Sequence, residues 1–215
     1  MRDSVVSAIE REGIVAVIRI KEPEKLRAVV DAIAEGGVRA LEVTMTVPGA
    51  VDLIRELAPT LPAGFVVGAG TVLDADTVNR VVDAGAQFVV SPVFRRSVIQ
   101  ACHDRGGPAM PGCFSPTEIL DAWEAGADVV KVFPATALGP GFFKDVRGPL
   151  PQVKMMPTGG VTLDNAGDWI RAGAIAVGVG TALLDAKAIA SGDYRTLRVN
   201  AERIVASVRA AKGRG

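Results

Sequence analysis

Lys131 is the residue with the clearest chemical potential, because it stands in a short apolar run that extends from Asp128 to Pro134. A valine-rich run of this length, closed by a proline, predicts a strand buried on both faces in a parallel sheet. Burial removes water from an ammonium group, disfavours its charged form and lowers its pKa. A neutral lysine can attack a carbonyl group and form a Schiff base. The alternative is a lysine at a strand end whose ammonium group reaches solvent.

A carboxylate on another predicted strand is a possible partner for this amine. Side chains alternate along a strand, so Glu42 shares a face with Thr44, and Lys131 shares one with Phe133. If these faces point inward, the two groups converge, and the carboxylate can move protons through a water. The other interpretation of Glu42 is a structural ion pair with Arg19 or Lys131.

Two glycine-containing turns are suited to an anion. Thr158-Gly159-Gly160 and Gly180-Thr181 follow the seventh and eighth apolar runs, and a helix is predicted after each. Backbone N–H groups at helix N-termini bind anions, and these two turns occupy the usual phosphate position of a (β/α)8 barrel. Tight turns also need glycine for conformational reasons, so only the two together favour a phosphate site.

The elements that must position these groups alternate regularly along the chain. After a short helix at residues 2–12, eight apolar runs alternate with eight helical stretches. Strict alternation predicts a closed α/β barrel, the (β/α)8 TIM barrel, and an open doubly wound sheet is the alternative. No linker divides residues 1–215, so we expect a single domain. The strands are expected at residues 14–18, 40–44, 65–70, 87–90, 108–111, 128–134, 153–156 and 175–180.

The ends of the predicted strands separate reactive charged residues from structural ones. In such barrels the reacting groups gather at the C-terminal ends of the strands. Arg19, Glu42 and Lys131 all stand at or near predicted strand C-termini. Arg39 and Asp128 stand at strand starts and are predicted to belong to the opposite rim. Lys154 also interrupts an apolar run, but four residues before Thr158, so we assign it to that rim as well.

Composition excludes several classes of function. Apolar residues make up 49% of the 215, and Lys+Arg and Asp+Glu balance at 24 each. The chain therefore has no net charge that would attract nucleic acid or an anionic membrane surface. We find no signal segment and no spanning apolar run, and therefore expect a cytoplasmic protein whose Cys102 and Cys113 are reduced. His103 is the only histidine and is assigned a structural role at a helix end, so we expect no catalytic zinc and no cofactor.

With these residues in place, the chain resembles the 2-keto-3-deoxy-6-phosphogluconate (KDPG) aldolases, which are class I, Schiff-base aldolases with a compact (β/α)8 barrel. The likeness covers nearly the whole length and is carried by motifs in the same order. They are Gly36-Gly37 through Leu41-Glu42-Val43-Thr44, Gly68-Ala69-Gly70-Thr71, Gly85-Ala86-Gln87-Phe88, Ser91-Pro92, Met110-Pro111-Gly112, Lys131-Val132-Phe133-Pro134 and Pro157-Thr158-Gly159-Gly160.

The resemblance implies a role for each matching position. Lys131 would form the Schiff base and Glu42 would transfer protons. The pyruvate pocket would be lined by Thr71, Pro92 and Phe133. The phosphate would be bound by Gly159, Gly160, Gly180 and Thr181, and Arg19 would contact an anion.

One position departs from the family pattern. Many members carry an arginine that assists carboxylate binding four residues after the glutamate, and here that position is Thr46. Recognition of the carboxylate then rests on Arg19, Thr71 or backbone N–H groups. Since relatives also cleave the phosphogalactonate epimer or 4-hydroxy-2-oxoglutarate, the exact substrate stays open.

The resemblance implies reversible cleavage of a phosphorylated 2-keto-3-deoxy sugar acid into pyruvate and glyceraldehyde 3-phosphate, by a homotrimer. Two other functions stay open. One is a phosphosugar isomerase or synthase in which Lys131 acts only through its charge. The other is a noncatalytic barrel that binds a phosphometabolite, because fold alone does not determine function.

Overall fold

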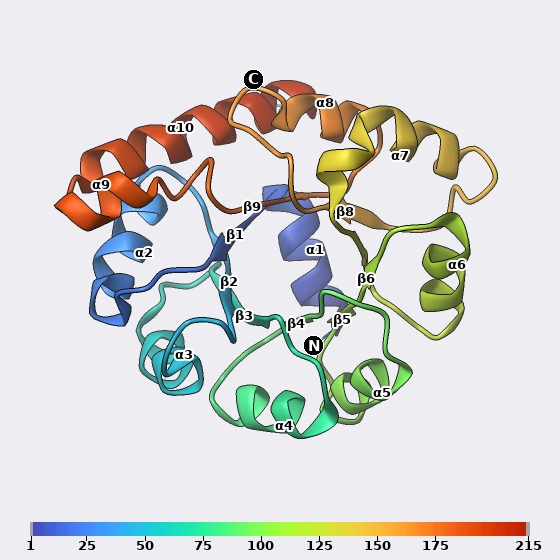
Figure 1. Cartoon of the computed structure of the whole chain (residues 1–215), viewed down its shortest axis with the longest axis horizontal. Coiled ribbons are helices and arrows are strands. Elements are labelled where there is room, and N and C mark those ends of the chain that lie inside the picture. Colours follow the sequence, from blue (N-terminus) through green and yellow to red (C-terminus); the bar gives the residue numbers. More distant parts are fainter. Residues whose placement is uncertain (1, 214–215) are drawn as a thin grey trace.

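The computed structural model describes residues 2–213 as a ring of parallel strands surrounded by helices (Figure 1). The strands are β1 (Ile14–Ile18), β2 (Ala40–Thr44), β3 (Val66–Gly70), β4 (Val89–Val90), β5 (Ala109–Met110), β6 (Gly112–Cys113), β7 (Val130–Val132), β8 (Met155–Pro157) and β9 (Val177–Val179). The helices are α1 (Arg2–Glu12), α2 (Leu26–Glu35), α3 (Ala50–Leu57), α4 (Ala75–Asp83), α5 (Arg96–Asp104), α6 (Pro116–Glu124), α7 (Gly139–Arg147), α8 (Ala166–Arg171), α9 (Ala186–Ser191) and α10 (Tyr194–Ala211).

The strands form two parallel sheets that together make the ring. One sheet has the order β5-β4-β3-β2-β1-β9 and the other the order β6-β7-β8. A parallel bridge between Thr158 and Gly178 joins β8 to β9, and β5 and β6 are separated in sequence by Pro111 alone. The ring therefore has eight positions, and the predicted (β/α)8 barrel is confirmed.

The predicted fifth strand is divided in two at Pro111. β5 pairs with β4, whereas β6 pairs with β7. Proline has no N–H group to donate to a ladder, so regular pairing breaks at that residue. One strand was predicted at residues 108–111. In the structure the element extends to Cys113 and consists of two short strands.

Local sequence signals account for several helix ends. Ser115 and Glu118 form a capping box at the start of α6, with Pro116 in the first turn. Asp74 caps α4 by accepting a hydrogen bond from the Thr77 backbone N–H.

Alternation along the strands produces two apolar cores. Outward side chains such as Ile18, Leu41 and Val132 pack against the surrounding helices. The interior of the barrel has its own cluster, to which α1 contributes Val5, Val6, Ala8 and Ile9. The strands and the residues just before them contribute Val15, Ala40, Val66, Phe88, Val90, Met110, Val129, Met156 and Ala176. Because this cluster includes residues at strand starts, such as Ala40 and Val66, α1 closes the N-terminal end of the barrel, and it lies within the ring in Figure 1.

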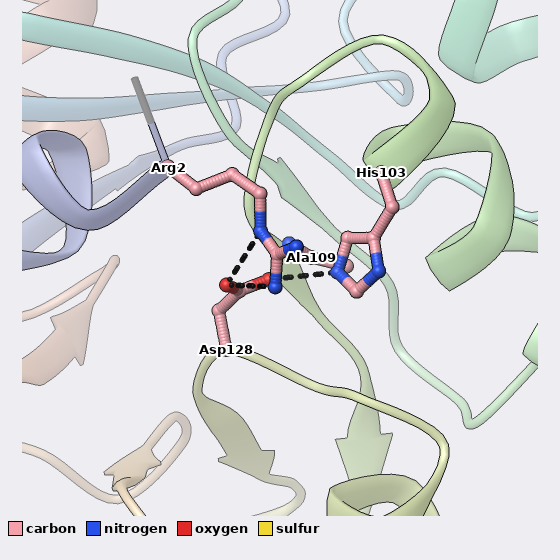
Figure 2. A network of polar contacts seen from close by, with 4 residues as sticks. All are labelled: Arg2, His103, Ala109 and Asp128. Carbon is pink, nitrogen blue, oxygen red and sulfur yellow. Dashed lines mark hydrogen bonds and ion pairs between the residues drawn. The ribbon is translucent and has the colours of Figure 1, made fainter.

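A polar network joins α1 to that end of the barrel (Figure 2). Arg2 donates from Nε and Nη2 to Asp128 Oδ1, at 3.1 and 2.9 Å. Asp128 Oδ2 lies 3.1 Å from His103 Nε2 and accepts a 2.9 Å hydrogen bond from the Ala109 backbone N–H. Asp128 is therefore a structural residue of the N-terminal rim, as the sequence indicates, and His103 is structural too.

The other predicted rim residues also lie at this end. Lys154 forms an ion pair with Glu10 of α1, with 3.0 Å between Nζ and Oε2. The Arg39 guanidinium stacks over the Phe65 ring, 5.2 Å from its centroid. Lys154 is thus paired at the opposite end from the proposed chemistry.

None of the described helices is both long enough and apolar enough to cross a bilayer.

Candidate active site

Lys131 lies inside the barrel. It is the central residue of β7, its relative exposure is 5%, and it shares a face with Val129, which belongs to the interior cluster. Its Nζ lies 5.0 Å from the centroid of the Phe133 ring, which is within the range of a cation–π contact. The burial of the residue does not support the alternative in which the lysine side chain extends to solvent.

Glu42 is a fully buried carboxylate on β2. Neither carboxylate oxygen has a hydrogen-bond partner within the described residues, and no ion pair of Glu42 is formed there. Burial raises the pKa of Glu42, and the positive charges of Lys131 and Arg19 act in the opposite direction. The interpretation as a structural ion pair is not supported, whereas a carboxyl group with a raised pKa is suited to accepting and returning protons.

A cavity of about 200 Å³ opens at the C-terminal end of the barrel. It brings together six of the predicted site residues, which are Arg19, Phe133, Gly159, Gly160, Gly180 and Thr181. Its wall is completed by Val17, Thr158, Val161, Gly178 and Leu184. Lys131 is not part of this wall, but its Nζ lies 5.0 Å from the centroid of the ring of Phe133, which is.

The two glycine turns differ from the prediction in one respect. α8 begins only at Ala166 and α9 at Ala186, so neither turn is at a helix N-terminus. Gly159 and Gly160 have φ values of 88° and 72°, and two successive residues in this region make a turn that cannot continue into a helix. The N–H groups of the turns, without a helix dipole, are what an anion would meet there.

Thr71 and Pro92 follow β3 and β4 at the same end of the barrel. Thr71 has a φ of 60°, a left-handed conformation that β-branched residues rarely adopt and that often occurs at functional sites. A Cβ atom on Gly112 would lie 2.2 Å from the Pro92 carbonyl oxygen, and Gly112 pairs with Lys131 in the ladder. Pro92 therefore packs against the strand next to the lysine.

Thr158 is a cavity residue that the sequence did not identify as a site residue by itself. The residue lines the cavity, and its hydroxyl group is buried and lacks a hydrogen-bond partner within the described residues. A buried hydroxyl without a partner is costly unless a ligand or water satisfies it. Its place in the Pro157-Thr158-Gly159-Gly160 turn was the available signal.

The family model described as KDPG and KHG aldolase matches residues 5–199. The chain belongs to this aldolase family. It is 36% identical over 183 residues to a probable 2-dehydro-3-deoxy-6-phosphogalactonate aldolase of Rhizobium meliloti (strain 1021), covering 85% of this chain and 86% of that protein. It is 34% identical over 192 residues to a 2-dehydro-3-deoxy-phosphogluconate aldolase of Treponema pallidum (strain Nichols), covering 89% of this chain and 91% of that protein.

A solved KDPG aldolase is similar in fold as well as in sequence. The enzyme from Legionella pneumophila, with pyruvate captured at low pH as a covalent carbinolamine, superposes with a TM-score of 0.85 at 30% identity. The match covers 93% of this chain and 97% of that one. This aldolase family member therefore shares its architecture with an enzyme that binds pyruvate covalently.

In this aldolase the position of the missing arginine is built differently. The Thr44 hydroxyl lies 3.1 Å from the Ile18 carbonyl oxygen and 2.7 Å from the Thr46 hydroxyl. A carbonyl can only accept, so when Thr44 donates its one hydrogen to Ile18, Thr46 must donate to Thr44. Thr46 then has only acceptor lone pairs left, and these do not suit a carboxylate.

Proposed function

We propose that the protein catalyses reversible aldol cleavage of KDPG into pyruvate and glyceraldehyde 3-phosphate, with Lys131 as the Schiff-base residue. The observation that carries this proposal is a lysine buried inside the barrel together with a buried carboxylate, Glu42, that has no structural partner among the described residues. Membership of the aldolase family and the covalent pyruvate adduct of the Legionella pneumophila enzyme support it.

The proposed chemistry begins at the C2 keto group of the substrate. The nitrogen of Lys131 adds to C2 through its lone pair, and loss of water from the carbinolamine gives an iminium. The C3–C4 bond then breaks, and its electron pair moves to the iminium nitrogen to give an enamine. Glu42, acting through a water, accepts the proton of the C4 hydroxyl, and the fragment that begins at C4 leaves as the aldehyde.

The second half of the reaction returns the proton and frees the enzyme. Protonation at C3 by Glu42 regenerates an iminium, and water hydrolyses it to pyruvate and the free amine. The iminium is the electron acceptor throughout, so the proposed reaction needs no added cofactor. Phe133 and the backbone around Pro92 would line the pyruvate end of the site.

The phosphate end is assigned to the cavity. We assign phosphate binding to the N–H groups and hydroxyl of the turns at Gly159, Gly160, Gly180 and Thr181, which line one cavity. Arg19 lines the same cavity, and no ion pair of Arg19 is formed within residues 2–213. It is thus a cation that a substrate anion can bind.

The C1 carboxylate needs a separate assignment. Because the Thr46 hydroxyl donates to Thr44 when Thr44 donates to Ile18, we assign the carboxylate to Arg19, to Thr71 or to backbone N–H groups at the ends of β3 and β4. The phosphogalactonate epimer is an alternative substrate because one of the relatives named above is a probable phosphogalactonate aldolase. 4-Hydroxy-2-oxoglutarate is another because the family description includes KHG aldolase.

A substrate panel tests the proposal. Purified protein is given KDPG, the phosphogalactonate epimer, 4-hydroxy-2-oxoglutarate and unphosphorylated 2-keto-3-deoxygluconate, and pyruvate release is coupled to lactate dehydrogenase. We expect the fastest release from KDPG, with a higher KM for the unphosphorylated acid because the cavity loses its anion. No pyruvate from any of the four would contradict the proposal and favour an isomerase or a noncatalytic binding protein.

The assembly and setting are proposals as well. We propose a homotrimer in which residues 1–215 of each chain form a single domain, acting in the cytoplasm. Support for the trimer comes from the family resemblance and from three exposed apolar side chains, Leu73, Val93 and Phe114, which follow β3, β4 and β6 at one end of the barrel. Sedimentation equilibrium checks this, and a monomer at micromolar concentration would contradict it.

A further inference from the structure

The carboxylate of Glu42 occupies space next to Gly70 on the neighbouring strand. Glu42 pairs with Gly68 in the β2–β3 ladder, and Thr44 pairs with Gly70. A Cβ atom on Gly70 would lie 1.9 Å from Glu42 Oε1, 2.6 Å from its Cδ and 2.7 Å from its Cγ. Any side chain at position 70 would therefore need the volume that the carboxylate now fills.

The backbone at Gly70 does not itself require glycine. Gly70 is the last residue of β3 and is not one of the described glycines with a positive φ. Glycine inside a strand weakens it, and it commonly marks a close approach of another group. Here the approaching group is a carboxylate, whereas at Gly68 it is the Phe88 ring, 2.5 Å from the added Cβ.

Nothing else among the described residues holds the carboxylate in place by a hydrogen bond. Both of its oxygens are buried and without a partner. The space available around the side chain therefore decides where the carboxylate lies. The charges closest in effect are those of Lys131 and Arg19, which attract it without forming an ion pair within residues 2–213.

We propose that Gly70 is a positioning residue for the aldolase reaction: its missing side chain places the Glu42 carboxylate for proton transfer at the substrate carbon next to the Lys131 imine. The inference rests on the proposed function. Two steps of the reaction should respond differently to a change at Gly70. Imine formation needs the lysine and the keto group, whereas removal of a C3 proton to give the enamine also needs a correctly placed base.

The two steps are measured separately on Gly70→Ala. Borohydride trapping of pyruvate on the protein reports the imine, and NMR in D2O reports exchange of the pyruvate methyl protons, in which the C–H electrons move into the imine and the proton moves to Glu42. We expect trapping within about threefold of the unsubstituted protein and exchange slowed about 100-fold, since a displacement of about 1 Å has that effect. Gly107→Ala is the matched control: its Cβ would meet no atom closer than 3.7 Å, and both signals should persist.

A second pair of variants guards against simple misfolding. Glu42→Ala removes the Cγ, Cδ and Oε1 atoms that the added Cβ would meet, and leaves room for a methyl group at position 70. Adding Gly70→Ala to Glu42→Ala should then leave Tm and borohydride trapping close to those of Glu42→Ala alone, because the clash has gone. If the single Gly70→Ala protein is insoluble, a soluble double variant shows that the contact with Glu42 is the cause.

Three results overturn the inference. They are exchange in Gly70→Ala within threefold of the unsubstituted protein, equal loss of trapping and exchange in Gly70→Ala, and a Gly70→Ala substitution that destabilises the Glu42→Ala protein as much as it does the unsubstituted one. Failure of the proposed function looks different, because the unsubstituted protein would then neither trap nor exchange pyruvate.

Discussion

Replacing Asp128 by alanine should destabilise the protein without removing its proposed chemistry. The carboxylate is 7% exposed and accepts two hydrogen bonds from Arg2, one from the Ala109 backbone N–H and one contact from His103 (Figure 2). It therefore ties α1, α5, β5 and the segment before β7 together. Alanine would leave the Ala109 N–H and the Arg2 guanidinium without this acceptor.

The magnitude follows from the exposure of each partner. Loss of the acceptor for a buried N–H costs about 1–3 kcal/mol. The Arg2 side chain is 40% exposed, so its ion pair contributes only about 0–1 kcal/mol. A total of about 3 kcal/mol corresponds to a fall in Tm of about 6–12 °C for a domain of this size. Asp128→Asn keeps one acceptor oxygen and should lose roughly half as much.

Differential scanning calorimetry at neutral pH measures this, with Asp164→Ala as the control. Asp164 also forms an ion pair, with Arg203 at 2.8 Å, but its side chain is 84% exposed, so its loss should cost less than about 0.5 kcal/mol. Well below Tm, the kcat of Asp128→Ala should stay within a few-fold, because the N-terminal rim serves stability. Equal changes in Tm for the two variants would refute the reasoning.

Three further predictions follow from individual groups. Burial raises the pKa of Glu42, so the unfolded chain releases this proton first as pH rises, and the stability of the folded protein declines through that range. Glu42→Gln removes this titrating group. The Tm of the variant minus that of the unsubstituted protein should therefore increase from about pH 4 to about pH 8, and a constant difference would contradict this. Burial raises the pKa of Cys102 and of Cys113 to about 12, so neither should react with iodoacetamide near pH 8 until guanidinium unfolds the protein, and rapid native labelling would be inconsistent with that burial. Thr158→Val should lower kcat/KM about 3- to 10-fold, because the buried hydroxyl would lose one hydrogen bond to substrate of about 0.5–1.5 kcal/mol. An unchanged kcat/KM would mean that this hydroxyl contacts only water.

The barrel and the positions of the two central residues could be predicted because they depend on local rules. Alternation along a strand grouped Glu42 with Thr44 and Lys131 with Phe133, and left open whether these faces point inward; the structure buries both residues. The C-terminal position of Arg19 assigned it to the catalytic end of the barrel, where it lines the cavity. The capping box at Ser115 and Glu118 was equally local. Lys154 could be assigned to the far rim by its distance from the end of its strand, and its ion pair is there.

What could not be predicted depends on where separate segments meet. The helix after the glycine turn begins at Ala166, because the turn continues through a loop in which Asn165 accepts from the Thr162 N–H and donates to the Gly160 carbonyl. The break at Pro111 required knowing that its two neighbours pair with different strands. The overlap between Gly70 and Glu42 exists only between strands, so the sequence indicated a glycine but not its reason.

The covalent attachment site of pyruvate tests the central claim most directly. The protein is incubated with pyruvate, reduced with borohydride, digested and mapped by mass spectrometry. We predict a three-carbon adduct on Lys131 inside the barrel, its loss in Lys131→Ala together with activity, and none on Lys154, which is paired with Glu10 at the other end. An unmodified Lys131, or a Lys131→Ala protein that cleaves KDPG at full rate, would contradict the account.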